Sequence, residues 1–112
     1  MSRTLLTREE FKKQVFAKTS GKCCIPGCGL PAVDAHHIMD RKLWSDGGYY
    51  LDNGASLCET HHLQAEKGII TPKRCYKLMG VTEYPKPDKV DWLTDGEFQE
   101  CVNNEIINKW GK

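Results

Sequence analysis

The sequence contains no apolar run long enough to cross a membrane, and its first residues lack the apolar stretch and cleavage site of a signal peptide. We therefore expect a cytoplasmic protein. Thiols rarely form structural disulfides in a reducing compartment, so the six cysteines are expected to be metal ligands or core residues rather than a disulfide scaffold. Internal repeats and low-complexity tracts are also missing. What remains is the composition of an ordinary globular chain.

A large excess of positive charge is missing as well, because the formal net charge is only +1. This value argues against a uniformly basic, nucleic-acid-binding surface. The charge is nevertheless uneven, since residues 1–42 carry +4, residues 43–77 carry 0 and residues 78–112 carry −3. We expect phosphate contacts to lie in the first two of these parts. The basic residues expected to make them are Lys12, Lys13, Arg41, Lys42, Lys73 and Arg74.

The size of the chain predicts one domain, residues 1–112, with a small core. Hydrophobic residues make up 39% of the sequence and charged residues 28%. A domain of this size buries a limited fraction of its surface and often needs a metal ion or another cross-link for stability. The six cysteines and four histidines are the candidates for that role.

One helix is predicted near the N-terminus, from about Arg8 to Lys18, because Thr7 and Glu10 have the spacing of a capping box. The central residues 32–67 begin with a short apolar segment, 32–38, that suits a strand. A glycine-containing loop, a tight turn at residues 52–54 and a second helix follow, with Ser56 as the possible N-cap of that helix. The predicted order is therefore strand, loop, strand or turn, helix.

Two further helices are predicted in a C-terminal extension, residues 71–112. Pro72 suits the first position of a short helix. Thr94 and Glu97 repeat the capping-box spacing and predict a last helix over residues 95–109. Its apolar residues at four-residue spacing are expected to dock on the core. They are Phe98, Val102, Ile106 and Trp110.

Four residues have the spacing of a structural zinc site. Two close pairs, Cys23 with Cys28 and Cys58 with His61, are separated by about thirty residues. Each pair can be positioned by a turn or by one turn of helix, and a metal ion would then close the long loop between them. Cys24 is an alternative to Cys23. The other two cysteines, Cys75 and Cys101, have no partner at ligand spacing and are expected to be small buried hydrophobes.

The central segment resembles the HNH endonucleases. The resemblance covers residues 23–67 and is carried by Ala35-His-His-Ile38, by Gly47-Gly48, and by the run from Asn53 to His62. It implies an α+β domain with a ββα-metal core and a zinc knuckle, preceded by one helix and followed by two. In this chain His61 stands where many zinc-bearing members have a second cysteine.

The resemblance also implies a division of work among the polar residues. His37 would take the proton from the attacking water, while His36 and His62 would hold one divalent cation against a non-bridging phosphate oxygen and the departing 3′ oxygen. Asn53 would fix the loop and orient His37. The cation would be Mg²⁺, Mn²⁺, Ni²⁺ or Zn²⁺, and two histidine ligands favour a transition metal over Mg²⁺. Asp34 could add a carboxylate, although a solvent-facing role is the simpler expectation.

Spacing alone leaves two points of geometry open. On a regular strand, His36 and His37 point to opposite faces, so both reach one phosphate only where the strand ends or bulges. On a helix, Cys58 is three residues from His61 and four from His62, so either histidine could share its face. The resemblance, rather than the spacing, gives His61 to zinc and His62 to catalysis.

By resemblance, the expected substrate is double-stranded DNA, and the products would carry a 5′ phosphate and a 3′ hydroxyl. Short free-standing HNH proteins occur in phages and mobile elements. By this analogy alone, we expect the chain to come from a phage or a mobile element. Two alternatives remain. One is a non-enzymatic zinc module that binds nucleic acid or protein, and the other is an RNA-directed nuclease that uses the same residues.

Overall fold

The centre of the fold is a two-stranded antiparallel sheet. The computed structural model describes residues 3–106, and in it strand β1 (Asp34–His37) pairs with strand β2 (Gly54–Leu57). The register places Asp34 opposite Leu57 and His37 opposite Gly54. The strand predicted over residues 32–38 is therefore confirmed in a shorter form. Its last residue is the proposed general base, so the sheet positions this side chain directly.

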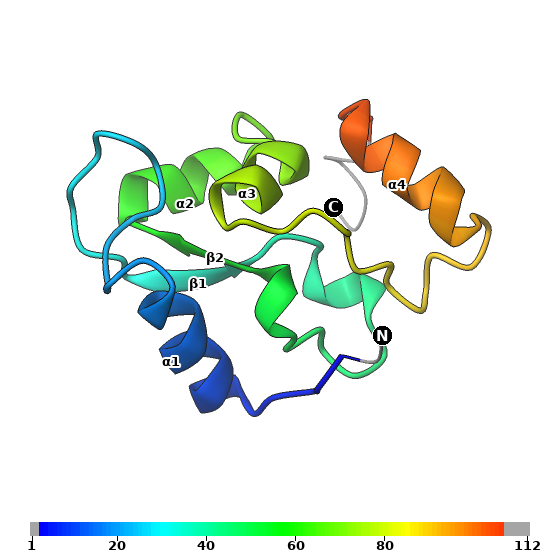
Figure 1. Ribbon diagram of the computed structural model, residues 1–112, viewed down its shortest axis with the longest axis horizontal. Coiled ribbons are helices and arrows are strands. Elements are labelled where there is room, and N and C mark those ends of the chain that lie inside the picture. The colour runs from blue at the N-terminus through cyan, green and yellow to red at the C-terminus, as the bar shows by residue number, and fades with distance from the viewer. Residues whose placement is uncertain (1–2, 107–112) are drawn as a thin grey trace.

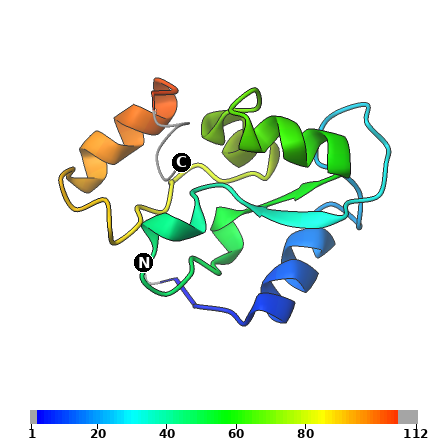
Figure 2. The same cartoon turned by 180° about the vertical axis from the view of Figure 1, so that it is seen from behind.

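Helices cover both faces of this sheet (Figures 1 and 2). Helix α1 (Arg8–Ala17) lies against one face, and α2 (Glu59–Glu66) and α3 (Pro72–Leu78) lie on the other. Helix α4 (Asp95–Asn103) contacts α3 at the periphery. Two short 3₁₀ helices, η1 (Arg41–Leu43) and η2 (Leu51–Asn53), occupy the connection between the strands. Over residues 3–106, the chain is thus a mixed α+β fold with four α-helices.

Helix α1 begins as the sequence predicts, because the Thr7 side chain accepts a hydrogen bond from Glu10 N and the Glu10 side chain accepts one from Thr7 N. Phe11 and Val15 form its buried face. This face packs so closely on the sheet that a Cβ at position 54 would lie 2.4 Å from Val15 Cγ2. Gly54 is therefore required where α1 crosses β2.

The second predicted helix starts later than expected. Ser56 is not its N-cap but a fully buried residue of β2, whose hydroxyl donates to the Val15 carbonyl at 3.0 Å. Helix α2 begins at Glu59 with Cys58 as the N-cap residue. A serine hydroxyl suits either position, and the distant partner on α1 decides between them. The outcome places two of the proposed metal ligands at the start of a helix.

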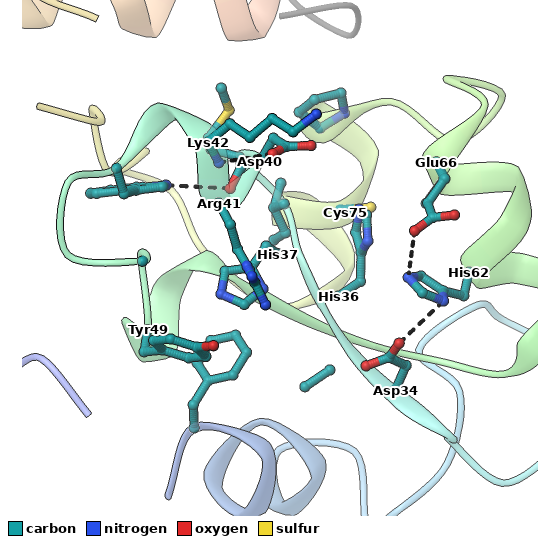
Figure 3. A pocket seen from close by; sticks show the side chains of 18 of the residues that line it. Asp34, His36, His37, Asp40, Arg41, Lys42, Tyr49, His62, Glu66 and Cys75 are labelled. Atoms are coloured by element: carbon teal, nitrogen blue, oxygen red, sulfur yellow. Dashed lines mark hydrogen bonds and ion pairs between the residues drawn. The ribbon is translucent and has the colours of Figure 1, made fainter. Parts of the chain in front are cut away.

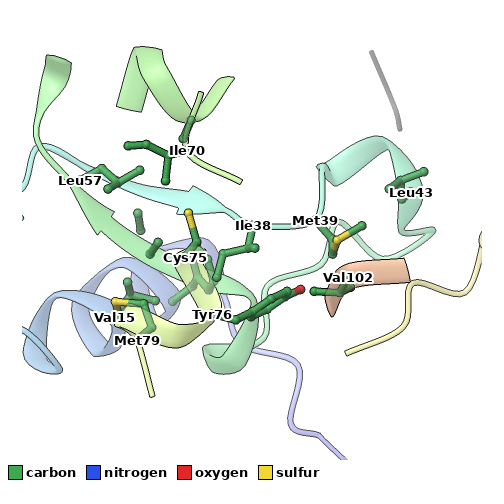
Figure 4. Packing of buried hydrophobic residues seen from close by; sticks show 14 of the residues in the cluster. Val15, Ile38, Met39, Leu43, Leu57, Ile70, Cys75, Tyr76, Met79 and Val102 are labelled. Carbon is green, nitrogen blue, oxygen red and sulfur yellow. The ribbon is translucent and has the colours of Figure 1, made fainter. Parts of the chain in front are cut away.

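The C-terminal helices contribute to the core around Tyr76 and Val102, both of which are fully buried (Figure 4). Helix α4 is shorter than the predicted 95–109, because it ends at Asn103 and Glu105 has a φ of 58°. Phe98 and Val102 dock as expected, while Ile106 lies beyond the helix and is 64% exposed. The remaining predicted contact, Trp110, lies outside the described residues, as do positions 107–109.

None of the helices within residues 3–106 has the length and apolar character needed to cross a membrane.

Candidate metal centre and active-site groove

Four side chains converge beside the sheet to form a compact donor cluster. They come from the loop before β1 and from the start of α2, and their ligand atoms all lie within 4.8 Å of one another. The four residues are Cys23, Cys28, Cys58 and His61. The cluster can hold a metal ion such as zinc, as the spacing of the two pairs predicts.

The distances within the cluster suit tetrahedral zinc. A zinc–sulfur bond of about 2.3 Å places two sulfurs of a tetrahedron about 3.8 Å apart, and a sulfur and a nitrogen slightly closer. The Sγ atoms of Cys28 and Cys58 are 3.8 Å apart. His61 Nδ1 lies 3.2 Å from Cys58 Sγ and 3.4 Å from Cys23 Sγ. These three distances are close to those between the ligands of one tetrahedral zinc ion.

Local backbone structure explains how the first pair of ligands is positioned. Cys23 N donates to the Leu30 carbonyl, and Lys22 forms an isolated bridge with Pro31, so the two ends of the loop are held together. Gly27 adopts a φ of 79°, a conformation that favours glycine. The loop is thus a hairpin-like knuckle that directs both thiols toward α2.

The second pair is positioned by the first turn of α2. Cys58 is its N-cap residue, and His61 lies three residues farther along. Burial tends to raise the pKa of the Cys58 thiol, but hydrogen bonds from the His61 backbone and from the other thiols outweigh it and lower this pKa. A lowered pKa favours the thiolate, which is the form that binds metal.

The remaining cysteines lie outside the cluster. Cys24, the alternative ligand, donates its backbone N–H to the Ser56 carbonyl, and burial raises the pKa of its thiol to about 11. Cys75 is 1% exposed, and burial raises its pKa to about 12. Cys101 is half-buried. Cys24 and Cys75 therefore remain protonated thiols at neutral pH.

A groove of about 720 Å³ runs along β1 and past its end (Figure 3). His36, His37 and His62 all line it, so the structure brings the three histidines of the HNH-like motif to one concave surface. Arg41 and Lys42 line it too. Lys73 and Arg74, which were also expected to bind nucleic acid, are not among its lining residues although the adjacent Pro72 and Cys75 are.

His36 and His37 leave the strand on opposite sides, as the alternation of a regular strand requires. The ring of His36 lies 5.2 Å from that of His62 on α2. The ring of His37 stacks on Phe11 of α1 at 4.9 Å and meets Tyr49 edge-on, also at 4.9 Å. Both reach the groove because β1 ends at His37, so that the groove passes around the end of the strand.

The environment of His37 keeps its imidazole neutral. Burial, and then the positive charge of Arg41, lower the pKa of His37 to about 4, while the charges of Asp40 and Asp34 and a hydrogen bond to the backbone of Gly47 raise it only partly. Its Nε2 atom is buried and has no hydrogen-bond partner among the described residues. A buried nitrogen without a partner is uncommon in proteins. At neutral pH this histidine is therefore uncharged, with one ring nitrogen free of hydrogen bonds to the described chain.

Asn53 links the segment just after β1, at Met39, to the glycine loop, at Gly48. The side chain is fully buried; its Oδ1 accepts from Met39 N at 2.9 Å, and its Nδ2 donates to the carbonyls of Met39 and Gly48, each at 3.2 Å. Met39 follows His37 by two residues, and Gly48 follows the Gly47 that bonds to His37. Asn53 therefore holds both backbone segments that surround the His37 ring.

Replacing Asn53 with alanine should lower the free energy of unfolding by about 1–3 kcal/mol, because it leaves the buried Met39 N–H without its partner and removes the weaker bond from the Tyr76 hydroxyl. The carbonyls of Met39 and Gly48 keep other donors, Trp44 Nε1 and Tyr50 N. Urea denaturation would measure the change. The matched control is Asn103→Ala, which removes only an exposed hydrogen bond from the Tyr84 hydroxyl; we expect a loss of about 1 kcal/mol or less there. Equal losses in the two variants would contradict the structural role of Asn53.

His62 lies between two carboxylates at the far end of the groove. Its Nδ1 is 3.3 Å from Asp34 Oδ2, and its Nε2 is 3.4 Å from Glu66 Oε1 (Figure 3). The sequence analysis missed Glu66, although its position four residues after His62 on a helix could have indicated it. Imidazole and carboxylate are a suitable donor set for a divalent transition metal.

This second donor set is looser than the first. Within residues 3–106, the cysteine-rich cluster is the one group of three or more histidine, cysteine, aspartate or glutamate side chains whose ligand atoms lie within 4.8 Å of one another. The ligand atoms at the His36–His62 end of the groove do not come together as closely, so this second set does not enclose an ion in the way that the cysteine-rich cluster can.

In comparisons with protein-family models, with curated proteins and with solved structures, the chain matches none.

Proposed function

We propose that the protein is a metal-dependent endonuclease of the HNH type, in which β1, β2 and α2 form a ββα-metal core. The observation that supports this best is the pairing, in one groove, of a neutral histidine with a histidine–carboxylate donor set. His37 supplies an uncharged ring whose Nε2 atom has no hydrogen-bond partner within residues 3–106. His36, His62 and Glu66 lie a short distance along the same groove.

The chemistry of phosphodiester hydrolysis requires both features. The phosphate carries a negative charge that repels nucleophiles, and its alkoxide leaving group is poor. His37 acts as the general base and accepts a proton from the attacking water, for which its neutral form is essential. His36 and His62, with Glu66, hold a divalent cation. When bound, this ion would neutralise a non-bridging phosphate oxygen and stabilise the departing 3′ oxygen.

The surrounding residues position the base. The Phe11 and Tyr49 rings fix the plane of the imidazole, and the Gly47 backbone engages it from the loop. Asn53 holds that loop against the end of β1. In this proposal the cysteine-rich cluster binds zinc for structural reasons, because it joins the knuckle to the start of α2 and contributes no residue to the lining of the groove.

The proposal predicts cleavage of supercoiled plasmid DNA that depends on added divalent cation. Purified protein should convert the plasmid to nicked or linear forms with Mg²⁺, Mn²⁺, Ni²⁺ or Zn²⁺, and chelation with EDTA should stop the reaction. Gel electrophoresis measures the products, and end-labelling should find 5′ phosphate and 3′ hydroxyl groups. A structured RNA tested in parallel would identify an RNA-directed nuclease. Absence of cleavage with every cation on both substrates would favour a zinc-binding interaction module instead.

A further inference from the structure

Two of the three carboxylates that line the groove lie at one of its ends. Asp34 and Glu66 both lie against His62, at the end where the cation would bind. The third lining carboxylate, Asp40, caps η1 by accepting a hydrogen bond from Lys42 N at 2.9 Å. Four basic side chains, Arg8, Lys12, Arg41 and Lys42, line the groove as well.

The first two basic side chains come from α1. Arg8 and Lys12 are both exposed and are separated by four residues, so they share one face of the helix. The same helix contributes Phe11, which stacks on His37. The Lys12 ammonium lies 5.6 Å from the centre of the Phe16 ring, a cation–π contact that leaves its charge available at the surface. The α1 wall of the groove is thus basic and adjoins the proposed base.

The other two basic side chains come from η1, the segment that follows β1. Arg41 and Lys42 are both exposed and line the groove. Figure 3 shows Arg41 beside His37, at the opposite end from His62 and its carboxylates. Two basic walls, from α1 and η1, therefore flank the His37 end of the groove.

We propose that Arg8 and Lys12 of α1 form, with Arg41 and Lys42, a two-sided clamp for the phosphodiester backbone of a nucleic-acid strand. The clamp holds phosphates next to the scissile one on the His37 side, while the carboxylate-rich end receives the cation. Separated basic walls suit a chain of phosphates that runs through the groove better than a single small anion. This inference rests on the proposed nuclease function and names the part of the groove that binds substrate.

The test is the salt dependence of DNA binding, measured by fluorescence anisotropy with a labelled duplex of mixed sequence. All proteins carry His37→Gln, so that the probe stays intact. Each lost phosphate contact should reduce the slope of log Kd against log salt by about 0.9, so Arg8→Ala/Lys12→Ala should reduce it by up to about 1.8. The matched control is Lys67→Ala/Lys77→Ala, which removes two exposed charges outside the groove; its slope should stay unchanged.

Arg8→Glu/Lys12→Glu is a second variant, because an acidic residue in the first turn of α1 favours the helix while the charge reversal opposes phosphate binding. It should bind more weakly than the alanine variant. Equal slopes for Arg8→Ala/Lys12→Ala and the control would overturn the clamp even if the wild type cleaves DNA. Conversely, the wild type could fail to cleave while Arg8→Ala/Lys12→Ala still has a smaller salt slope than the control. That result would support the clamp and reject the nuclease. A His37→Gln protein that does not bind DNA at low salt would overturn the clamp.

Discussion

Replacing Cys28 with serine should remove the structural zinc and, with it, cooperative unfolding. The donor distances in the cluster match tetrahedral zinc, and the ion would join the knuckle of residues 23–28 to the start of α2. Binding of zinc to such sites contributes on the order of 10–16 kcal/mol in small domains. The whole stability of a domain is only about 5–15 kcal/mol, so the metal-free chain has little left to hold this region together. Elemental analysis after dialysis and thermal unfolding followed by circular dichroism would measure both effects.

Cys24→Ser is the matched control, because Cys24 is the neighbour of a proposed ligand but lies outside the donor cluster. This variant should keep about one zinc per chain and a cooperative transition. Cys23→Ser should behave like Cys28→Ser. If the wild type proves stable and cooperatively folded without metal, the cluster does not serve as a structural zinc site.

Elements whose signals are local could be predicted well from the sequence. Both capping boxes form as expected, at Thr7 with Glu10 and at Thr94 with Glu97, because each needs only residues three apart on one chain segment. The two halves of the cysteine-rich donor cluster can be recognised in the sequence for the same reason. Each pair is held by a turn or by one turn of helix.

Elements that depend on distant partners could not be predicted in the same way. Ser56 has the local properties of an N-cap. Its hydroxyl instead donates to the carbonyl of Val15 on α1, forty-one residues earlier in the chain, and Ser56 belongs to β2. Similarly, the apolar spacing suggests that α4 continues to residue 109, whereas the helix ends at Asn103. Apolar residues at helical spacing do not show where the core ends, and the core decides how far the helix continues.

The candidate site shows the same difference between local signals, which the sequence reveals, and contacts between distant residues, which it does not. Motif spacing indicated the histidines, but not that Glu66 faces His62 across one helical turn, nor that Arg8 and Lys12 share the groove with them. The charge distribution pointed to Lys12, Arg41 and Lys42, which do line the groove, but it did not indicate Arg8 and it also included Lys13, Lys73 and Arg74, which are not among the lining residues. Which basic residues meet one cavity depends on how α1 crosses the sheet, and that crossing is set by tertiary packing at Gly54.

The substitution that separates an enzyme from a binding module is His37→Ala. If His37 is the general base, the variant loses the proton acceptor while the cysteine-rich cluster and the His36–His62 end keep their ligands. General-base catalysis typically contributes about 10²–10⁴-fold, so plasmid cleavage should fall by that order. Zinc content and DNA affinity should stay close to those of the wild type. Single-turnover cleavage, elemental analysis and fluorescence anisotropy measure the three properties.

Because His37 packs on Phe11 and Tyr49, alanine at this position could also loosen the end of β1. His37→Gln controls for this effect, since an amide can still bond to the Gly47 backbone but cannot take up a proton at neutral pH. We expect it to fold like the wild type and to cleave as poorly as His37→Ala.

His62→Ala provides the contrast, because it removes a proposed ligand of the cation and leaves the base in place. Raising the concentration of divalent cation should restore part of its activity, since weaker binding can be compensated by mass action. The same increase should not restore His37→Gln, whose missing group is a proton acceptor. If His37→Gln cleaves as fast as the wild type, or if both variants respond alike to added cation, the assignment of His37 as the base is wrong.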